Sequence, residues 1–351
     1  MIQPVTPEVP MHIRRITAAI AAAAIPLTMT AAPAVAAPDN GGKANQPSAA
    51  AESAALPEHQ LTGYWQNFVN DAEPLRVSDI PDNYDLVALA FAQSDAASPG
   101  AVKFSVDSRL SDALGGYSDA QLKADIAEKQ SQGTDFVMSI GGAKGSVDLS
   151  TEQRVTNFVD SMTTIIENYD LDGLDIDLEH SFDTAGMTSA ARQLRNHFGS
   201  DFILTMAPQT LYVQPGGSYM QLIDNLSDII TTVHTQYYNS GSMLGCDQQV
   251  YSQGSVDFIT AQACILLDKL SADQIALGLP AAPSAAGSGY VQPSVVTDAL
   301  DCLASTTDCG QFVPGQPHPS ISGVMTWSIN WDVSNGTTFS TTVGNHLETL
   351  P

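Results

Sequence analysis

Leu171-Asp172-Gly173-Leu174-Asp175-Ile176-Asp177-Leu178-Glu179-His180 is the stretch of sequence that decides the fold. As a β-strand, it places its aliphatic side chains on one face and three acids on the other: Asp175, Asp177 and Glu179. An acidic, solvated turn is the alternative interpretation. The strict alternation of apolar and acidic residues favours the strand.

Three carboxyl groups along one strand face are not expected to be ionised together near neutral pH. Alternate side chains lie about 6.6 Å apart, so two neighbouring carboxylates repel by about 2.5 kcal/mol at an effective dielectric of about 20. This repulsion raises a pKa by nearly two units. We therefore expect a shared proton, with Asp175 able to hold it, and an acid protonated near neutrality suits general acid catalysis.

The composition is that of a globular protein with a very acidic surface. The chain has 351 residues, of which 43% are hydrophobic and 7% aromatic. Its net charge is −25, from 13 basic and 38 acidic residues, which argues against nucleic acid and anionic membranes as partners. An acidic surface keeps a protein soluble, so the charge does not require a cationic substrate.

The N-terminal region resembles an export signal. Translation from Met11 would place two arginines before an Ala-rich apolar run, which Ala34-Val35-Ala36 follows as a cleavage pattern. The run is too short to favour a membrane span. We expect a signal peptide at residues 1–37, a disordered linker at 38–57 and one domain at 58–351, in a secreted, extracellular protein.

Four cysteines suit that compartment. They allow three pairings, and proximity alone favours Cys246–Cys264 and Cys302–Cys309. In the chain-entropy model these bonds would contribute about 3 and about 2.5 kcal/mol. A zinc site is the alternative, but a CxxC pair and a nearby histidine are missing, so we expect no metal.

Short apolar runs alternate with helical stretches after residue 58. We expect strands at residues 61–65, 86–91, 135–140, 173–177, 202–206, 232–237, 274–279 and 323–327, and helices at residues 119–130, 151–168, 188–197, 255–270 and 293–303. Eight such units fit an α/β fold of the (β/α)8 TIM-barrel type. A doubly wound sheet is the alternative, but no glycine-rich phosphate motif follows the first strand.

In this barrel the active site lies at the carboxyl ends of the strands. Polar or aromatic residues occur at several of these ends: Tyr64, Trp65, Ser139, Asp177, Glu179, Met206, Gln236, Tyr238 and Trp327. Side chains from separate strands are therefore expected to meet at one mouth.

Four motifs at these ends carry a family resemblance. They are Asp172 to Glu179 (DGxDxDxE), Ser139-Ile140-Gly141-Gly142 (SxGG), Gln236-Tyr237-Tyr238-Asn239 (QxYN) and Met325-Thr326-Trp327. Each motif stands at the strand end expected for it, and the chain thus resembles glycoside hydrolase family 18, in particular secreted bacterial chitinases. The resemblance covers about residues 60–345.

The resemblance implies a role for each acid. Glu179 would protonate the glycosidic oxygen and later act as a base. Asp177 would hold the substrate's 2-acetamido group, and Asp175 would lie buried beneath it, bonded by Tyr64 and Ser139. The acetamido oxygen itself would attack C1, an exception to the two-carboxylate scheme that retains the β-configuration.

The resemblance also implies substrate contacts but no cofactor. Tyr238 would bond the acetamido carbonyl, and Trp327 would form an apolar floor for the sugar ring. The expected substrate-binding residues are Trp327, Gln236, Asn239, Met206, Tyr64 and Ser139. Gln209 stands where relatives often carry Glu, which leaves the support of its loop open. His180 is expected to be a hydrogen-bonding neighbour rather than a catalytic group.

The implied function is a monomeric, secreted chitinase that acts on chitin and N-acetylglucosamine oligosaccharides. An endo-β-N-acetylglucosaminidase acting on N-glycan cores shares these acids and is the alternative. A chitin-binding lectin and a Mg²⁺ or Ca²⁺ site are further alternatives. Because Pro280 and Ser322 enclose only about 40 residues, we expect no large α+β insertion and hence a shallow cleft.

Overall fold

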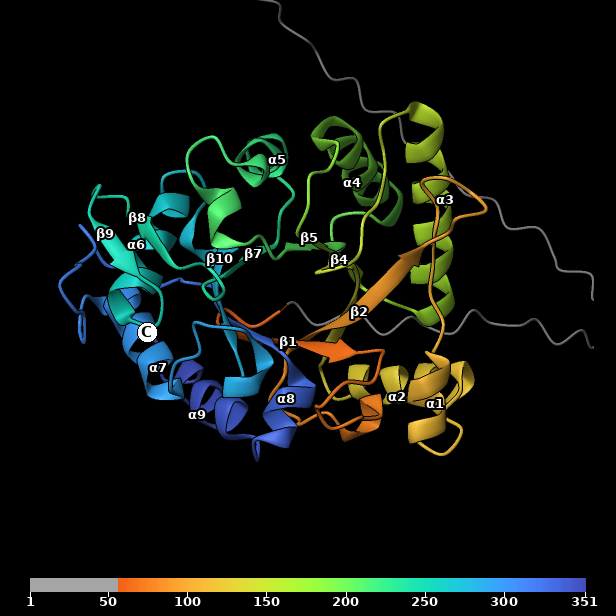
Figure 1. Ribbon diagram of the computed structural model, residues 1–351, viewed down its shortest axis with the longest axis horizontal. Coiled ribbons are helices and arrows are strands. Elements are labelled where there is room, and N and C mark those ends of the chain that lie inside the picture. Colours follow the sequence, from red (N-terminus) through yellow and green to blue (C-terminus); the bar gives the residue numbers. More distant parts are fainter. Residues whose placement is uncertain (1–55) are drawn as a thin grey trace, which may run out of the picture. The chain divides into compact units, whose positions relative to one another are not determined.

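Eight parallel strands close into a barrel in the computed structural model, which describes residues 56–351 (Figure 1). The strands are β1 (Gln60–Gln66), β2 (Leu86–Ser94), β4 (Asp135–Gly142), β5 (Gly173–Leu178), β6 (Ile203–Met206), β7 (Thr232–Gln236), β10 (Ile275–Pro280) and β11 (Gly323–Trp327). They pair in this order, and β11 returns to β1. The expected (β/α)8 fold and its eight strands are confirmed. The expected signal peptide at 1–37, and the linker at 38–57 except for its last two residues, lie outside the described residues.

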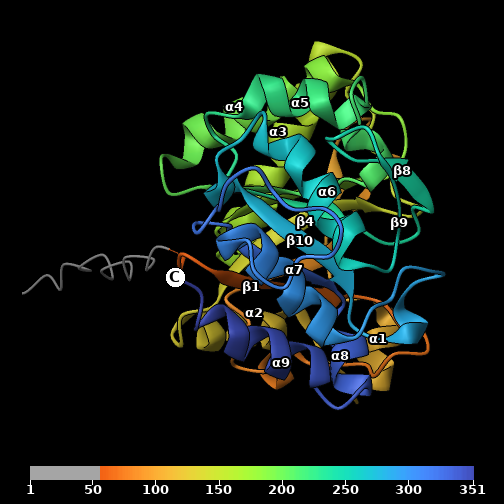
Figure 2. The same ribbon diagram turned by 90° about the vertical axis from the view of Figure 1, so that its left-hand side faces the viewer.

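Helices surround the strands in both ribbon views (Figures 1 and 2). They are α1 (Ser108–Ala113), α2 (Asp119–Gln130), α3 (Glu152–Tyr169), α4 (Thr184–Phe198), α5 (Ser218–Leu226), α6 (Val256–Leu267), α7 (Pro293–Ser305), α8 (Ile329–Ser334) and α9 (Thr338–Leu347). Side-chain caps begin several of them, as where Ser118 and Thr151 accept backbone N–H bonds at the starts of α2 and α3. None of the helices in residues 56–351 is long and apolar enough to span a bilayer.

Side-chain alternation on β5 separates the core from the barrel interior. Leu174, Ile176 and Leu178 pack in the main hydrophobic core, which strands and helices share. Asp175 and Asp177 point the other way and are 0% and 3% exposed. The strand interpretation of this stretch is confirmed, and the solvated turn is excluded.

The barrel closes where β1 meets β11. Gln60 pairs with Gly323 in the parallel register of these two strands. Gly323 has a φ of +135°, and a Cβ there would overlap the carbonyl oxygen of Gln60. A glycine at this position therefore allows the first and last strands to approach closely enough to pair.

Additions to the barrel are small. Strand β3 (Val102–Lys103) pairs with the end of β2, and β8 (Ser242–Leu244) and β9 (Val250–Ser252) form a hairpin after β7. Between β10 and β11, residues 281–322 contain helix α7 and no strand. The expected absence of an α+β insertion is thus confirmed for this segment.

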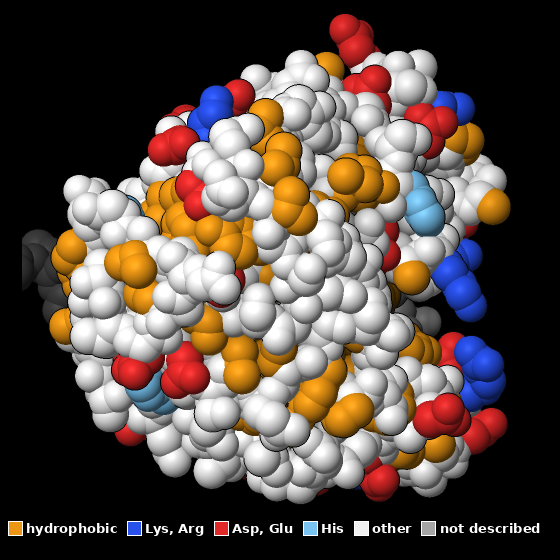
Figure 3. All heavy atoms as spheres, turned by 60° about the vertical axis from the view of Figure 1, so that its left-hand side comes forward, with side chains coloured by type: hydrophobic (Ala, Val, Ile, Leu, Met, Phe, Trp, Pro, Cys, Tyr) orange, Lys and Arg blue, Asp and Glu red, His pale blue; other side chains and the backbone are white. Residues whose placement is uncertain are grey.

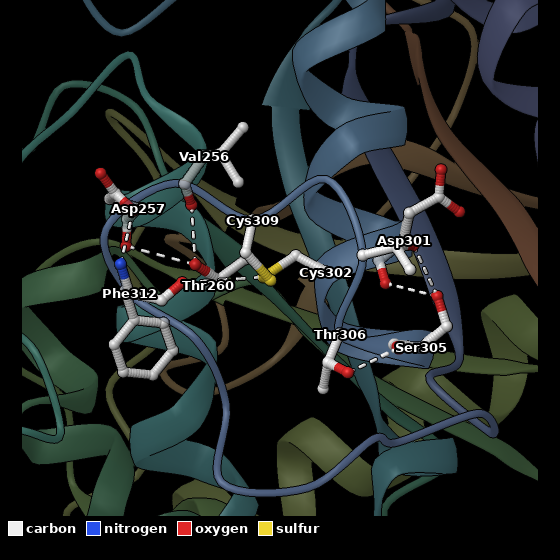
Figure 4. The surroundings of a disulfide bond; sticks show 10 residues. Val256, Asp257, Thr260, Asp301, Cys302, Ser305, Thr306, Cys309 and Phe312 are labelled. Carbon is white, nitrogen blue, oxygen red and sulfur yellow. Dashed lines mark hydrogen bonds between the residues drawn. A yellow bond between two sulfur atoms is a disulfide. The ribbon is translucent and has the colours of Figure 1, made fainter.

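Both preferred disulfides are present. Cys246, next to the β8–β9 hairpin, bonds Cys264 of α6, and Cys302 of α7 bonds Cys309 in the loop that follows. This loop is also tied to α6, because the backbone N–H of Phe312 donates to Asp257 at 2.9 Å (Figure 4). Each disulfide therefore fixes a segment that lies outside the barrel strands.

Removing the second disulfide is expected to cost moderate stability. The double substitution C302A/C309A should lower the free energy of unfolding by about 2.5 kcal/mol, because its loop is short. The Cys246–Cys264 bond closes a longer loop, so C246A/C264A should lower the free energy of unfolding by about 3 kcal/mol. Urea denaturation of both variants measures these losses. A loss in C302A/C309A several times larger than that in C246A/C264A would contradict the chain-entropy account.

Candidate active site

A cavity of about 430 Å³ lies at the carboxyl ends of the barrel strands. Its volume is within the range of small-ligand pockets. The sequence-predicted residues that line it come from β1, β5, β7, β11 and the loops after them: Tyr64, Asp177, Glu179, Gln236, Tyr238, Asn239 and Trp327. Folding therefore brings seven of the ten predicted site residues to one place.

Asp175 lies beneath the cavity as a fully hydrogen-bonded carboxyl group. Tyr64 Oη and Ser139 Oγ donate to its Oδ2 at 2.7 and 2.6 Å, and Thr205 Oγ1 donates to Oδ1 at 2.7 Å. Burial raises the pKa of Asp175, while these three hydroxyl donors oppose the rise. Ser139 contacts Asp175 and does not line the cavity, so its place is that of a support.

Asp177 is the acid whose ionisation is most strongly disfavoured. Burial, the charge of Glu179 and the charge of Asp175 together raise the pKa of Asp177 well above its usual value. One hydrogen bond opposes the rise, from Gln236 Nε2 to Asp177 Oδ1 at 2.8 Å. The pKa of Asp177, which accepts one side-chain donor, is thus raised more strongly than the pKa of Asp175, whose two oxygens accept three donors.

Glu179 follows the last residue of β5 and is half-buried. Its Oε2 accepts a bond of 2.8 Å from Gln209 Nε2, and Tyr212 Oη donates to its backbone oxygen at 3.1 Å. Burial raises the pKa of Glu179, while the amides of Gln236 and Gln209 lower it. The charge of Glu179 in turn raises the pKa of the neighbouring Asp177.

Aromatic rings enclose Trp327 at the cavity. The Trp327 ring is stacked on Phe91, with ring centroids 6.0 Å apart and an interplanar angle of 16°, and on Phe68, with values of 6.4 Å and 26°. The Tyr64 ring is tilted against Trp327 at a centroid distance of 5.5 Å. Burial and the charges of Asp177 and Glu179 raise the pKa of Tyr238 well above its usual value, so its hydroxyl stays a proton donor. The cavity thus has a flat apolar wall and a neutral donor.

Met206 is not brought to the cavity. The preceding Thr205 faces Asp175 inside the barrel, so Met206 lies on the opposite face of β6, fully buried in the core beneath the helices. Because successive residues of a strand face opposite sides, Met206 is not one of the substrate-binding residues.

His180 Nε2 lies 3.1 Å from the carbonyl oxygen of Ala143, as expected of a hydrogen-bonding neighbour.

The glycines of the SxGG motif allow β4 and β5 to approach at the site. Gly141 pairs with Asp177 in the parallel register, and its φ is +112°. A Cβ at Gly141 would overlap the carbonyl oxygen of Asp177. A larger residue would therefore displace the strand that carries the acids.

The surface of the protein carries many more acidic than basic side chains. On the face in Figure 3, acidic side chains are spread among few basic ones, as expected of a solvated acidic surface. Among residues 56–351, no group of three or more histidine, cysteine or acidic side chains is arranged to hold a metal ion.

A (β/α)8 barrel whose pocket combines paired carboxyl groups, amides and a stacked tryptophan is a barrel of the glycosidase type. The sequence model of Glycosyl hydrolases family 18 matches residues 60–342. The chain belongs to this family.

Relatives agree with this assignment. Exochitinase 1 of Streptomyces olivaceoviridis is 36% identical over 347 residues, covering 86% of this chain and 58% of that protein. A crystal structure of a protein provisionally named chitinase A from Streptomyces coelicolor is 49% identical, with a TM-score of 0.80, over 84% of this chain and 99% of that one. A family GH18 chitinase structure from Chromobacterium violaceum is 35% identical, with a TM-score of 0.78, over 84% and 85%.

The chain does not span the full length of the first curated relatives. It covers 58% to 60% of three such proteins.

Proposed function

We propose that this protein is a chitinase that hydrolyses β-1,4 linkages between N-acetylglucosamine units with retention of configuration. The observation that carries the proposal is the placement of the two acids in the cavity. Asp177 and Glu179 are alternate residues at the end of one strand, so they reach the substrate from the same side. Membership of glycoside hydrolase family 18 supports a reaction without a protein nucleophile, an exception to the scheme in which a second carboxyl group attacks the sugar.

The substrate must then supply the nucleophile, and an N-acetyl sugar has one in its acetamido oxygen. Glu179 donates its proton to the glycosidic oxygen as the acetamido oxygen bonds to C1 and the glycosidic bond breaks. Asp177 accepts the acetamido N–H in its ionised form, which the developing positive charge favours, while Asp175 holds the spare proton. Water then attacks C1 and displaces the acetamido oxygen, while the ionised Glu179 removes a proton from that water. This step restores the acid.

The remaining residues have supporting roles in this proposal. Tyr238 donates its hydroxyl proton to the acetamido group, and Trp327 contacts the apolar face of the sugar ring. Gln236 and Asn239, at and after the end of β7, contact the substrate. Tyr64 and Ser139 hold Asp175 in place through hydrogen bonds. Asp175, beneath Asp177, is the acid that can hold the spare proton while Asp177 is ionised.

Hydrolysis of N-acetylglucosamine hexamer tests this function. We expect shorter oligomers whose newly formed ends keep the β-configuration, detected by NMR within the first turnovers. Release of an intact glycan from a high-mannose glycoprotein, with no product from colloidal chitin, would instead identify an endo-β-N-acetylglucosaminidase. Binding without any hydrolysis would identify a lectin, and loss of activity in excess chelator would identify a metal-dependent site.

The proposal extends to where and on what the protein acts. We propose an exported monomer, on the basis of the signal pattern expected at residues 1–37 and the two disulfides. The helical connection at residues 281–322 supports an open cleft, and hence a preference for soluble or amorphous chitin. Comparable rates on crystalline chitin and on soluble oligomers would contradict that preference.

A further inference from the structure

Gln209 is a polar side chain in direct contact with Glu179 that lies outside the four motifs. It is half-buried and follows β6 by three residues. Its Nε2 donates to Glu179 Oε2 at 2.8 Å. It does not line the cavity with Glu179 and Gln236, so it approaches the carboxyl group from outside the substrate space.

The backbone holds this amide in register with a second one. Gln209 forms an isolated parallel bridge with Gln236 at the end of β7, and Gln236 N–H donates to the Pro208 carbonyl oxygen at 2.9 Å. Thr210 Oγ1 also donates to the Gln236 carbonyl oxygen, at 2.6 Å. The result is two adjacent glutamines whose amides lie against the acids: Gln236 Nε2 donates to Asp177 and also acts on Glu179, and Gln209 Nε2 donates to Oε2 of Glu179.

A donated amide proton distinguishes the two oxygens of a carboxyl group. Oε2 of Glu179 faces an N–H, so a proton on Oε2 would point at another proton. The proton of the neutral acid is therefore carried by Oε1. We propose that Gln209 is a positioning residue for the hydrolysis proposed above: its amide fixes Oε2 of Glu179, so that Oε1 carries the proton that is transferred to the substrate.

The contact also has an electrostatic consequence. A hydrogen bond donated to a carboxylate favours the ionised form, and the amides of Gln236 and Gln209 accordingly lower the pKa of Glu179 against the effect of burial. The titratable groups facing Glu179 are Asp177 on β5, His180 next in the chain, Tyr238 after β7 and Tyr219 on α5. None of these changes when Gln209 alone is replaced.

The test is the pH dependence of kcat/KM for Gln209→Met and Gln209→Glu. Methionine has a similar length but no donor, so the pKa of Glu179 should rise and the alkaline limb should move up by about one pH unit. Gln209→Glu adds a second carboxyl group, and the limb should move further in the same direction. The value of kcat at the optimum should fall about tenfold in Gln209→Met, because the carboxyl group is free to rotate.

Gln214→Met is the matched control. Gln214 lies five residues further along the same loop and bonds Gln262 instead of an acid. An unchanged alkaline limb in Gln214→Met, together with shifted limbs in both Gln209 variants, supports the inference. A uniform loss of activity at every pH in Gln209→Met, or a lower melting temperature with no shift of the limb, would show that Gln209 is only structural and overturn it.

Failure of the proposed function is distinguished by the unsubstituted protein, which would then not hydrolyse the hexamer. In that case, ¹³C NMR titration of the Glu179 carboxyl group, assigned with Glu179→Gln, still decides the inference. A higher titration midpoint in Gln209→Met than in the unsubstituted protein supports the contact. Equal midpoints overturn it.

Discussion

Glu179→Gln is expected to reduce kcat on N-acetylglucosamine hexamer by about a thousandfold or more, because it removes the only proton donor that the proposed mechanism uses. The replacement keeps the shape of the side chain, and its amide oxygen can still accept the bond from Gln209. The free energy of unfolding should therefore change little. Oligosaccharide affinity, measured by calorimetry, should remain within a few-fold of the original.

A second glutamate provides the control. Glu128→Gln makes the same chemical change on an exposed position of α2, and activity should be unaffected. If Glu179→Gln kept activity within about tenfold of the unsubstituted protein, the assignment of Glu179 as the acid would be wrong. Loss of affinity together with kcat would instead indicate that Glu179 acts in binding.

Asp177→Asn is expected to lower kcat by about a hundredfold to a thousandfold. Asparagine can still accept the bond from Gln236, but it cannot supply the negative charge that stabilises the developing positive charge on the acetamido group. Single-turnover rates measure the effect on the chemical step. Asp160→Asn, on an exposed position of α3, is the control and should leave the rate unchanged.

Asp177→Asn should also alter the pH dependence of the free energy of unfolding. The pKa of Asp177 is raised on folding, so its favourable contribution is present below its unfolded value of about 3.9 and is lost as pH rises through the folded value. Asp177→Asn should therefore be more stable than the unsubstituted protein at pH 7. The difference should shrink towards pH 4, as measured by thermal unfolding. A difference independent of pH would contradict the burial of an ionisable acid here.

The barrel strands could be predicted from sequence because each is a short, nearly continuous apolar run. The smaller elements could not be, for reasons visible in their residues. Strands β3, β8 and β9 are two or three residues long and largely exposed, so no apolar periodicity marks them. Helix α4 begins at Thr184, earlier than expected, because Asp183 caps it.

The site residues that belong to sequence motifs could be predicted. Contacts between residues that are far apart in the sequence could not be, because they form only on folding. Phe68 and Phe91 reach Trp327 only when β11 closes beside β1, and no local pattern indicates this approach. Gln209 meets Glu179 across two strand ends in the same way. The side of β6 that Met206 faces could have been predicted from the sequence. Thr205 and Ala207 suit the barrel interior, so Met206, which lies between them, faces the opposite side.

The order of proton affinities needed three-dimensional contacts. From the sequence, Asp175 is the acid expected to be able to hold the shared proton, and the family resemblance implies its bonds from Tyr64 and Ser139. The third donor, Thr205 on β6, was not predicted. The pKa of Asp175, whose oxygens accept three donors, is raised, whereas the pKa of Asp177 is raised well above its usual value.

The close pairing of Gln60 with Gly323 also affects how the protein is made. A chain leaving the ribosome has β1 long before β11 exists, and until then both β1 and β10 have an unpaired edge that can bind other chains. Since Trp327 lies on β11, the cavity is incomplete for nearly the whole of synthesis. A chain that ended before β11 would therefore lack part of the cavity and would expose two strand edges that favour aggregation.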